Sequence, residues 1–120
     1  MRRDRPEQQM QRAVIEYLAW SARPDVFSFH YPAGGWRSKV EAKILKAIGT
    51  VAGIPDVICI FEGRVFALEL KSEHGRLTEI QRATQGRLRA AGVTVATAYN
   101  FDAAIAQLAT WGLLRDRRAA

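Results

Sequence analysis

Two short apolar runs separated by a single tight turn constrain the fold of this chain more than any other feature. The first run covers residues 56–61 and the second covers residues 64–71. Only residues 62–63 separate them, and a two-residue connection of this kind predicts an antiparallel hairpin. Because side chains alternate faces along a strand, Glu69 and Lys71 are predicted to project from the same face of the second strand.

The hairpin predicts that two carboxylates lie opposite each other. Asp56 begins the first strand and Glu69 lies near the end of the second, so the pair should meet across the ladder. Two adjacent carboxylates repel each other unless a proton or a cation lies between them, and oxygen ligands suit Mg²⁺ or Mn²⁺. The backbone carbonyl of Leu70 could add a ligand, and Lys71 could hold a water or stabilise negative charge.

The alternative interpretation of these residues is purely structural. Glu69 and Lys71 could form a salt bridge at the protein surface, with Asp56 as an ordinary turn residue. An isolated Glu-X-Lys tripeptide would favour that interpretation. The preceding Gly53-Ile54-Pro55 segment and the hairpin spacing favour a functional site instead.

The first predicted helix covers residues 7–20 and has one apolar stripe. Its members recur at intervals of three and four residues and are Met10, Ala13, Val14, Tyr17 and Leu18. A helical wheel places Glu7 within this stripe and Glu16 outside it. Glu7 is therefore predicted to face the core or a site at its edge, and Glu16 to face solvent.

The remaining pattern predicts an α/β fold with a mixed central sheet of about four strands flanked by helices. Strands are expected near residues 26–31 and 93–99, in addition to the hairpin. Further helices are expected from Ser38 to Gly49, from Thr78 to Gly92 and over residues 102–111. The helix after the hairpin should act as a crossover, which makes the strands on either side of it parallel if they are adjacent. Residues 1–120 are expected to form a single domain.

The charge balance points to an anionic partner. The chain has 120 residues, 18 Lys and Arg, 12 Asp and Glu, and a formal net charge of +6. A basic surface of this kind suits nucleic acid or an anionic membrane, although it could serve solubility alone. The single cysteine, Cys59, excludes an intramolecular disulfide and favours a reducing compartment. The sequence has neither an apolar signal region nor a membrane-length apolar run, so a cytoplasmic protein is expected.

The long signature from Gly53 to Gln81 resembles the PD-(D/E)xK nuclease superfamily. Its parts are Gly53-Ile54-Pro55-Asp56, Glu69-Leu70-Lys71, Gly75-Arg76-Leu77-Thr78 and Gln81. Within that superfamily the chain is similar to the stand-alone VRR-Nuc branch, many of whose members are encoded by phages. The similarity extends from Glu7 to about Asp102. It implies a restriction-endonuclease-like fold with an αβββαβ core.

The resemblance also implies roles for particular residues. Metal ligands would be Asp56, Glu69 and the Leu70 carbonyl, with Glu7 acting through a water. Lys71 would lie near the attacking water. Gln81 would enter the site from the next helix. The acid that the family carries on its first helix matches Glu7 better than Glu16, in agreement with the helical wheel.

Basic side chains around this signature are candidates for contacts with a phosphate backbone. The candidates for nucleic-acid binding are His30, Arg37, Lys39, Lys43, Arg76 and Arg82. A histidine at a strand end is as often a structural hydrogen-bonding residue, so both interpretations of His30 remain open. Family members often carry an asparagine in the loop after the first strand, where this chain has Tyr31-Pro32-Ala33-Gly34-Gly35.

These observations predict an Mg²⁺- or Mn²⁺-dependent endonuclease that hydrolyses DNA phosphodiesters. By resemblance, it would be a homodimer that nicks DNA or cuts branched DNA such as Holliday junctions. Trp111 with the last helix, or Trp36 with its loop, are the predicted dimer contacts. The rival predictions are a nucleic-acid-binding module without catalytic activity and an accessory domain that binds a protein partner.

Overall fold

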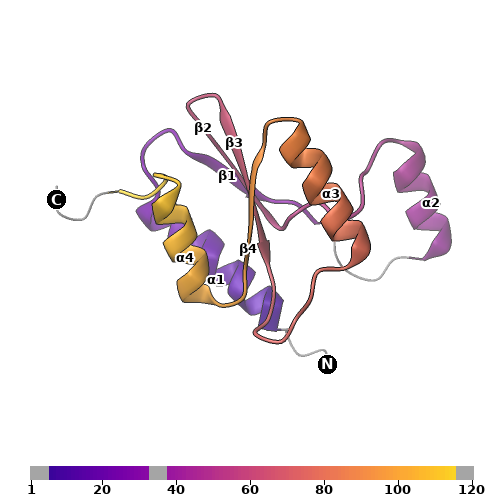
Figure 1. The fold of residues 1–120 in the computed structure, drawn as a ribbon, viewed down its shortest axis with the longest axis horizontal. Coiled ribbons are helices and arrows are strands. Elements are labelled where there is room, and N and C mark those ends of the chain that lie inside the picture. The colour runs from indigo at the N-terminus through magenta and orange to yellow at the C-terminus, as the bar shows by residue number, and fades with distance from the viewer. Residues whose placement is uncertain (1–5, 33–37, 116–120) are drawn as a thin grey trace.

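A computed structural model describes residues 6–32 and 38–115 of the chain, and these residues form a four-stranded mixed sheet with helices around it (Figure 1). The elements in chain order are α1 (Pro6–Ser21), β1 (Phe27–His30), α2 (Lys39–Ala47), β2 (Val57–Phe61), β3 (Arg64–Leu70), α3 (Glu79–Ala90), β4 (Thr94–Ala98) and α4 (Phe101–Thr110). The predicted α/β fold class is confirmed, and the predicted boundaries agree within about two residues. None of the described helices is long and apolar enough to cross a membrane.

The strand order β1-β2-β3-β4 follows the chain. The predicted hairpin is present, because β2 and β3 pair antiparallel with Phe61 opposite Arg64. Glu62 and Gly63 turn the chain with positive φ values of 51° and 74°, as a two-residue hairpin turn requires. Helix α3 then crosses over, so β4 pairs parallel with β3, as predicted. Both β1 and β4 are edge strands.

One face of the sheet packs against α1 and α4 and forms the core (Figure 1). The core side chains from the sheet alternate along the strands and are Val57, Cys59, Phe66, Leu68, Leu70 and Ala98. Val14 and Leu18 of α1 are buried against them, which confirms the predicted stripe, and Glu16 is exposed. The Trp111 ring lies 5.2 Å from that of Phe66, and this partly buried tryptophan packs against the core.

Among the described residues, the opposite face is covered along β4 and part of β3. Helix α3 lies there, and the Gln85 amide donates a hydrogen bond to Thr97 of β4 over 3.2 Å. Along β1 and β2 the same face leaves apolar side chains exposed. Phe27 and Phe29 contact each other with ring centroids 5.8 Å apart, and Ile60 lies directly opposite Phe27.

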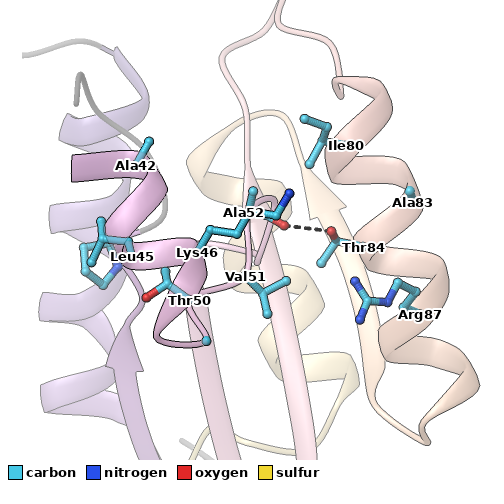
Figure 2. A pocket seen from close by; sticks show the side chains of 12 residues that line it. Ala42, Leu45, Lys46, Thr50, Val51, Ala52, Ile80, Ala83, Thr84 and Arg87 are labelled. Carbon is cyan, nitrogen blue, oxygen red and sulfur yellow. Dashed lines mark hydrogen bonds between the residues drawn. The ribbon is translucent and has the colours of Figure 1, made fainter. Parts of the chain in front are cut away.

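Helix α2 stands apart from the rest of the molecule (Figure 1). Ser38 caps it by accepting a hydrogen bond from the Glu41 backbone, as predicted, yet none of its nine described residues is buried. A cavity of about 640 Å³ separates α2 from α3, with Leu45 on one wall and Ile80 and Thr84 on the other (Figure 2). Within residues 6–32 and 38–115, no helix or strand packs closely enough against α2 to bury one of its side chains.

Gly53 shows why the loop before β2 needs a glycine. Its φ is +82°, a conformation that L side chains rarely adopt. A Cβ built there would lie 2.9 Å from the Ile80 backbone oxygen and 2.9 Å from the Thr84 hydroxyl. Thr84 in turn donates a 2.8 Å hydrogen bond to the Ala52 carbonyl (Figure 2). This close approach fixes the loop that leads into Asp56 against α3.

Replacing Gly53 by alanine is expected to destabilise the protein by about 2 kcal/mol, because the new methyl group meets backbone at a positive φ. The matched control is Gly86→Ala in α3, where a Cβ meets nothing within 4 Å. That substitution should stabilise the protein by about 0.5–1 kcal/mol. Urea unfolding of both variants measures the difference, and equal effects would contradict the close approach.

Candidate active site and metal centre

Asp56 and Glu69 meet at the open end of the β2–β3 hairpin. Val57 pairs with Leu68, so the next position along the ladder places Asp56 opposite Glu69. The Asp56 carboxylate accepts a 2.7 Å hydrogen bond from the Leu70 backbone amide. This hydrogen bond holds one Asp56 carboxylate oxygen against β3, on the side where Glu69 lies. The predicted juxtaposition of the two acids is therefore present.

The Glu69 carboxyl is the most strongly perturbed acid in the described residues. Its side chain is 3% exposed, and its Oε1 atom is buried without a hydrogen-bond partner among the described residues. Burial raises the pKa of Glu69, as do the hydrogen bond and negative charge of Asp56 and the charge of Glu7, whereas Lys71 lowers it; the result is about 9. A buried, unsatisfied oxygen beside a second carboxylate is what a bound cation would complete.

This raised pKa predicts how the metal-free protein responds to pH. Between about 4.5, the ordinary value for Glu69, and about 9, the folded state binds a proton that the unfolded state has released. Stability from this group is therefore fully present below the lower value and is lost as pH rises through the upper value. The slope is at most about 1.4 kcal/mol per pH unit.

Urea unfolding in the presence of a chelator at several pH values from about 5 to about 9 tests this response. Glu69→Gln removes the titrating group, so its unfolding free energy should decline less steeply than that of the wild type. The difference between the two curves isolates Glu69 from all other titrating groups. If the unfolding free energies of the wild type and Glu69→Gln changed with pH in parallel, the raised pKa of Glu69 would be contradicted.

Lys71 lies immediately after β3 and is only 7% exposed. Its backbone amide donates a 2.9 Å hydrogen bond to the Ala98 carbonyl, which continues the pairing with β4 and fixes the position of the residue. Glu69 and Lys71 are thus both buried, and the alternative of a salt bridge at the protein surface is wrong. Burying an ammonium group is costly, and the charge of Lys71 acts on the buried Glu69 carboxyl, whose pKa it lowers. This pairing inside the protein favours a functional role.

Glu7 reaches this site from α1, as the helical wheel predicted. Its Oε2 atom accepts a 3.1 Å hydrogen bond from the Ser72 backbone amide, directly after Lys71. A Cβ on Gly75 would lie 3.2 Å from the same oxygen, so the glycine leaves room for the carboxylate. The contributions of Ser72 and Gly75 could not be predicted from the sequence, because both depend on a contact between distant parts of the chain.

Gln81 lies in the first turn of α3, where its side chain takes part in a capping box. Its Oε1 atom accepts a 2.9 Å hydrogen bond from the Thr78 amide, and the Thr78 hydroxyl accepts one from the Gln81 amide over 3.1 Å. The side-chain oxygen of Gln81 therefore holds the start of α3. The three-residue spacing of Thr78 and Gln81 is typical of a capping box, so the sequence contains a signal for this structural role. The family resemblance suggested only a role for Gln81 in the active site.

His30 contacts the site through backbone. Its Nδ1 atom lies 3.0 Å from the Asp56 carbonyl oxygen, which also accepts a 2.9 Å hydrogen bond from the Tyr31 amide. Because a carbonyl can only accept, Nδ1 carries the proton in this contact. His30 therefore makes the structural hydrogen bond that one of its two interpretations predicted, and its ring is exposed. Its role as a DNA contact is still a prediction.

The candidate phosphate-binding side chains that the structure describes are all exposed: Lys39, Lys43, Arg76 and Arg82. Lys39 and Lys43 belong to α2, whereas Arg76 and Arg82 border the start of α3. Arg37 and Trp36 lie outside the described residues. Exposed cations of this kind are the side chains that a phosphodiester backbone would contact.

The carboxylates fit a hard divalent cation, with few protein ligands. Within the described ranges, no three side chains of His, Cys, Asp or Glu are grouped closely enough to form a metal cluster. Mg²⁺ is commonly held by one or two carboxylates, keeps several waters and binds substrate phosphate. Asp56 and the unsatisfied Glu69 oxygen would supply the carboxylates, and the Leu70 carbonyl could add a neutral ligand.

Comparison with solved structures identifies the fold. A structure described as a "VRR_NUC domain protein" matches with a TM-score of 0.75 and 21% identity, over 92% of this chain and 90% of that chain. A second, described as "VRR_NUC domain", matches with a TM-score of 0.60 and 17% identity, over 89% and 97%. The chain therefore has the fold of a stand-alone VRR-Nuc domain. No family model and no curated protein sequence matches the chain.

Proposed function

We propose that the protein is an Mg²⁺- or Mn²⁺-dependent endonuclease of the VRR-Nuc type that hydrolyses DNA phosphodiesters. The observation that carries this proposal is the pairing of half-buried Asp56 with buried Glu69, with one unsatisfied Glu69 oxygen and Lys71 beside it. The VRR-Nuc fold and the signature from Gly53 to Gln81 support the same conclusion. A binding module without catalysis would not need buried acids arranged in this way.

Each residue of the site has a proposed role. A divalent ion held by Asp56, Glu69 and the Leu70 carbonyl would polarise the phosphate and make a bound water more acidic. Lys71 would position the attacking water and stabilise negative charge on the phosphate. Glu7, fixed by the Ser72 amide, would accept a hydrogen bond from a water in the site. Because the Gln81 oxygen caps α3, only its amide nitrogen would contact substrate or water.

The exposed cations would position DNA without reading its sequence. In this proposal, the phosphate contacts come from His30, Lys39, Lys43, Arg76 and Arg82, with Arg37 as a further candidate. The protein would nick duplex DNA or cut branched DNA, including four-way junctions. Paired cuts in a junction need two active sites, and a two-fold homodimer presents them most simply.

The function is tested by incubating the purified protein with supercoiled plasmid and with matched flap, splayed, nicked and four-way DNA substrates. Nicking that requires Mg²⁺ or Mn²⁺ and stops on chelation is the expected result. Binding of the same substrates without cleavage, under either metal, would overturn the enzymatic assignment and leave the rival binding module.

The two acids of α1 provide an internal comparison. Glu7→Gln should reduce the cleavage rate by about 10- to 100-fold, because it alters a group that orients the immediate surroundings of the metal. Glu16→Gln, on the exposed side of the same helix, should leave the rate unchanged. Equal losses in single-turnover cleavage, or a larger loss at Glu16, would show that the wrong acid has been assigned.

A further inference from the structure

Trp20 is the most exposed large apolar side chain among the described residues, at 83%. It lies near the end of α1 and lines a cavity of about 430 Å³ between the C-terminal parts of α1 and α4, here called the α1–α4 cavity. Tyr17, Ile105 and Leu114 give this cavity an apolar wall, and Arg115 also lines it. A single apolar residue on a protein surface is ordinary, whereas an exposed tryptophan that continues into an apolar cavity marks an interaction surface.

Backbone hydrogen bonds hold the walls of the α1–α4 cavity in place. The Arg115 amide donates a 2.8 Å hydrogen bond to the Ser21 carbonyl, and the Arg23 amide donates one of 2.8 Å to the Leu113 carbonyl. These two contacts join the segment after α4 to the end of α1. The cavity is therefore preformed, and a ligand that enters it would order little of the protein, which favours affinity.

Arg115 is the one charged side chain among the described residues that line the cavity. Its Nε atom donates a 3.0 Å hydrogen bond to the Ala22 carbonyl, which orients the guanidinium and leaves its two terminal nitrogens without a hydrogen bond to any described residue. Glu16 and Asp102, the acids of α1 and α4 nearest in the chain, are exposed and do not line the cavity. A carboxylate on a ligand would complement this guanidinium.

We propose that the α1–α4 cavity binds a protein partner through a segment that presents an aromatic or large aliphatic side chain next to a carboxylate. The apolar side chain would enter the cavity beside Trp20, and the carboxylate would pair with Arg115. Tryptophan, tyrosine and arginine are the residue types enriched at the anchoring positions of protein interfaces, and all three line this cavity. This inference does not rest on the proposed nuclease activity.

The position and charge of the cavity favour a protein over DNA. Helices α1 and α4 cover one face of the sheet and α3 lies on the other, whereas the candidate DNA-binding cations on helices belong to α2 and α3 (Figure 1). Trp20 lies about 20 Å along α1 from Glu7, at 1.5 Å per residue. A phosphate backbone is bound by several cations, and the described cavity wall has one. A protein bound there would leave the carboxylate pair accessible.

Selection from a display library of random short peptides tests the chemistry of the partner directly. The wild-type protein is the target, and peptides that also bind Trp20→Ser are removed in every round, so ligands of other surfaces are discarded. The peptides that remain should combine an aromatic or large aliphatic residue with aspartate or glutamate. Selection that enriches no peptide, or enriches peptides without acidic residues, would overturn the proposal.

Fluorescence anisotropy of a labelled, selected peptide then locates its binding site. Trp20→Ser and Arg115→Gln should each raise the Kd at least about 10-fold, as expected for anchoring residues. Glutamine removes the charge but keeps a donor for the Ala22 carbonyl, and thermal unfolding checks that both variants fold. The matched controls are Phe27→Ser on β1 and Arg89→Ala on α3, which alter exposed residues elsewhere and should leave the Kd unchanged. Equal losses in the controls would contradict the assigned site.

Two further results would assign the cavity to another occupant and overturn the proposal. If single-stranded oligothymidine displaced the peptide in the presence of a chelator, the cavity would be a DNA-binding site. If Trp20→Ser changed the sedimentation of the protein, the cavity would be a contact between copies of the chain. None of these measurements reads DNA cleavage, so failure here and failure of the proposed nuclease activity are distinguishable.

Discussion

Asp56→Asn and Glu69→Gln are each expected to reduce DNA cleavage by at least about 10³-fold, which corresponds to about 4 kcal/mol of transition-state stabilisation. Each substitution removes one of the two negative charges that would hold the cation. The fold should survive, because an asparagine oxygen can still accept the hydrogen bond from the Leu70 amide. Single-turnover cleavage, with DNA binding measured separately, separates loss of chemistry from loss of affinity.

The control for this pair is Glu62→Gln in the turn at the other end of the same hairpin. It removes an equal charge from an exposed position and should leave cleavage unchanged. In metal-free buffer near pH 8, Glu69→Gln should be at least as stable as the wild type, because folding of the wild type at this pH requires Glu69 to take up a proton, whereas glutamine is neutral in both states. Wild-type cleavage by either site variant would contradict the assigned metal ligands.

Lys71→Met is expected to reduce cleavage by about 10²–10³-fold, the usual cost of removing one positioned charge or donor from an active site. Methionine keeps much of the length and apolar character of the buried side chain, so packing should be largely retained. Since Lys71 lowers the pKa of Glu69, its loss should also move the pH-dependent loss of metal-free stability to higher pH.

Lys46→Met on α2 is the matched control, because it removes the same charge from an exposed position. It should leave both cleavage and the pH dependence unaltered. Lys71→Arg keeps the charge but changes its shape and is expected to recover only part of the activity. Full activity in Lys71→Met would remove this residue from the proposed chemistry.

The part of the site that could be predicted from the sequence is the part fixed by local geometry. A two-residue turn sets the register of the hairpin, and that register alone places Asp56 opposite Glu69. The position of Glu7 followed from the helical period, because Val14 and Leu18 define the buried side of α1. These inferences need only the spacing of residues within one element or one hairpin.

The remaining features depend on contacts between distant segments and could not be predicted in this way. Glu7 is held by Ser72, which lies 65 positions along the chain. Gly53 is required because Ile80 and Thr84 of α3 lie close to it. The sequence around Gly53 does not indicate that α3 packs there. The exposed α2 was also unexpected, since the amphipathic pattern of a buried helix is the same as that of a helix awaiting a partner.

The central claim is that the carboxylate pair of Asp56 and Glu69 is a metal site, and titration of metal-free protein with MnCl₂ tests it most directly. Electron paramagnetic resonance of free Mn²⁺ gives the bound fraction, and unbuffered pH measurement gives the protons released. We expect metal bound by the wild type with proton release, because the ion must displace the proton held by Glu69. Asp56→Asn and Glu69→Gln should lose most of this binding. Wild-type protein that retains no Mn²⁺, or variants that bind it equally well, would contradict the account.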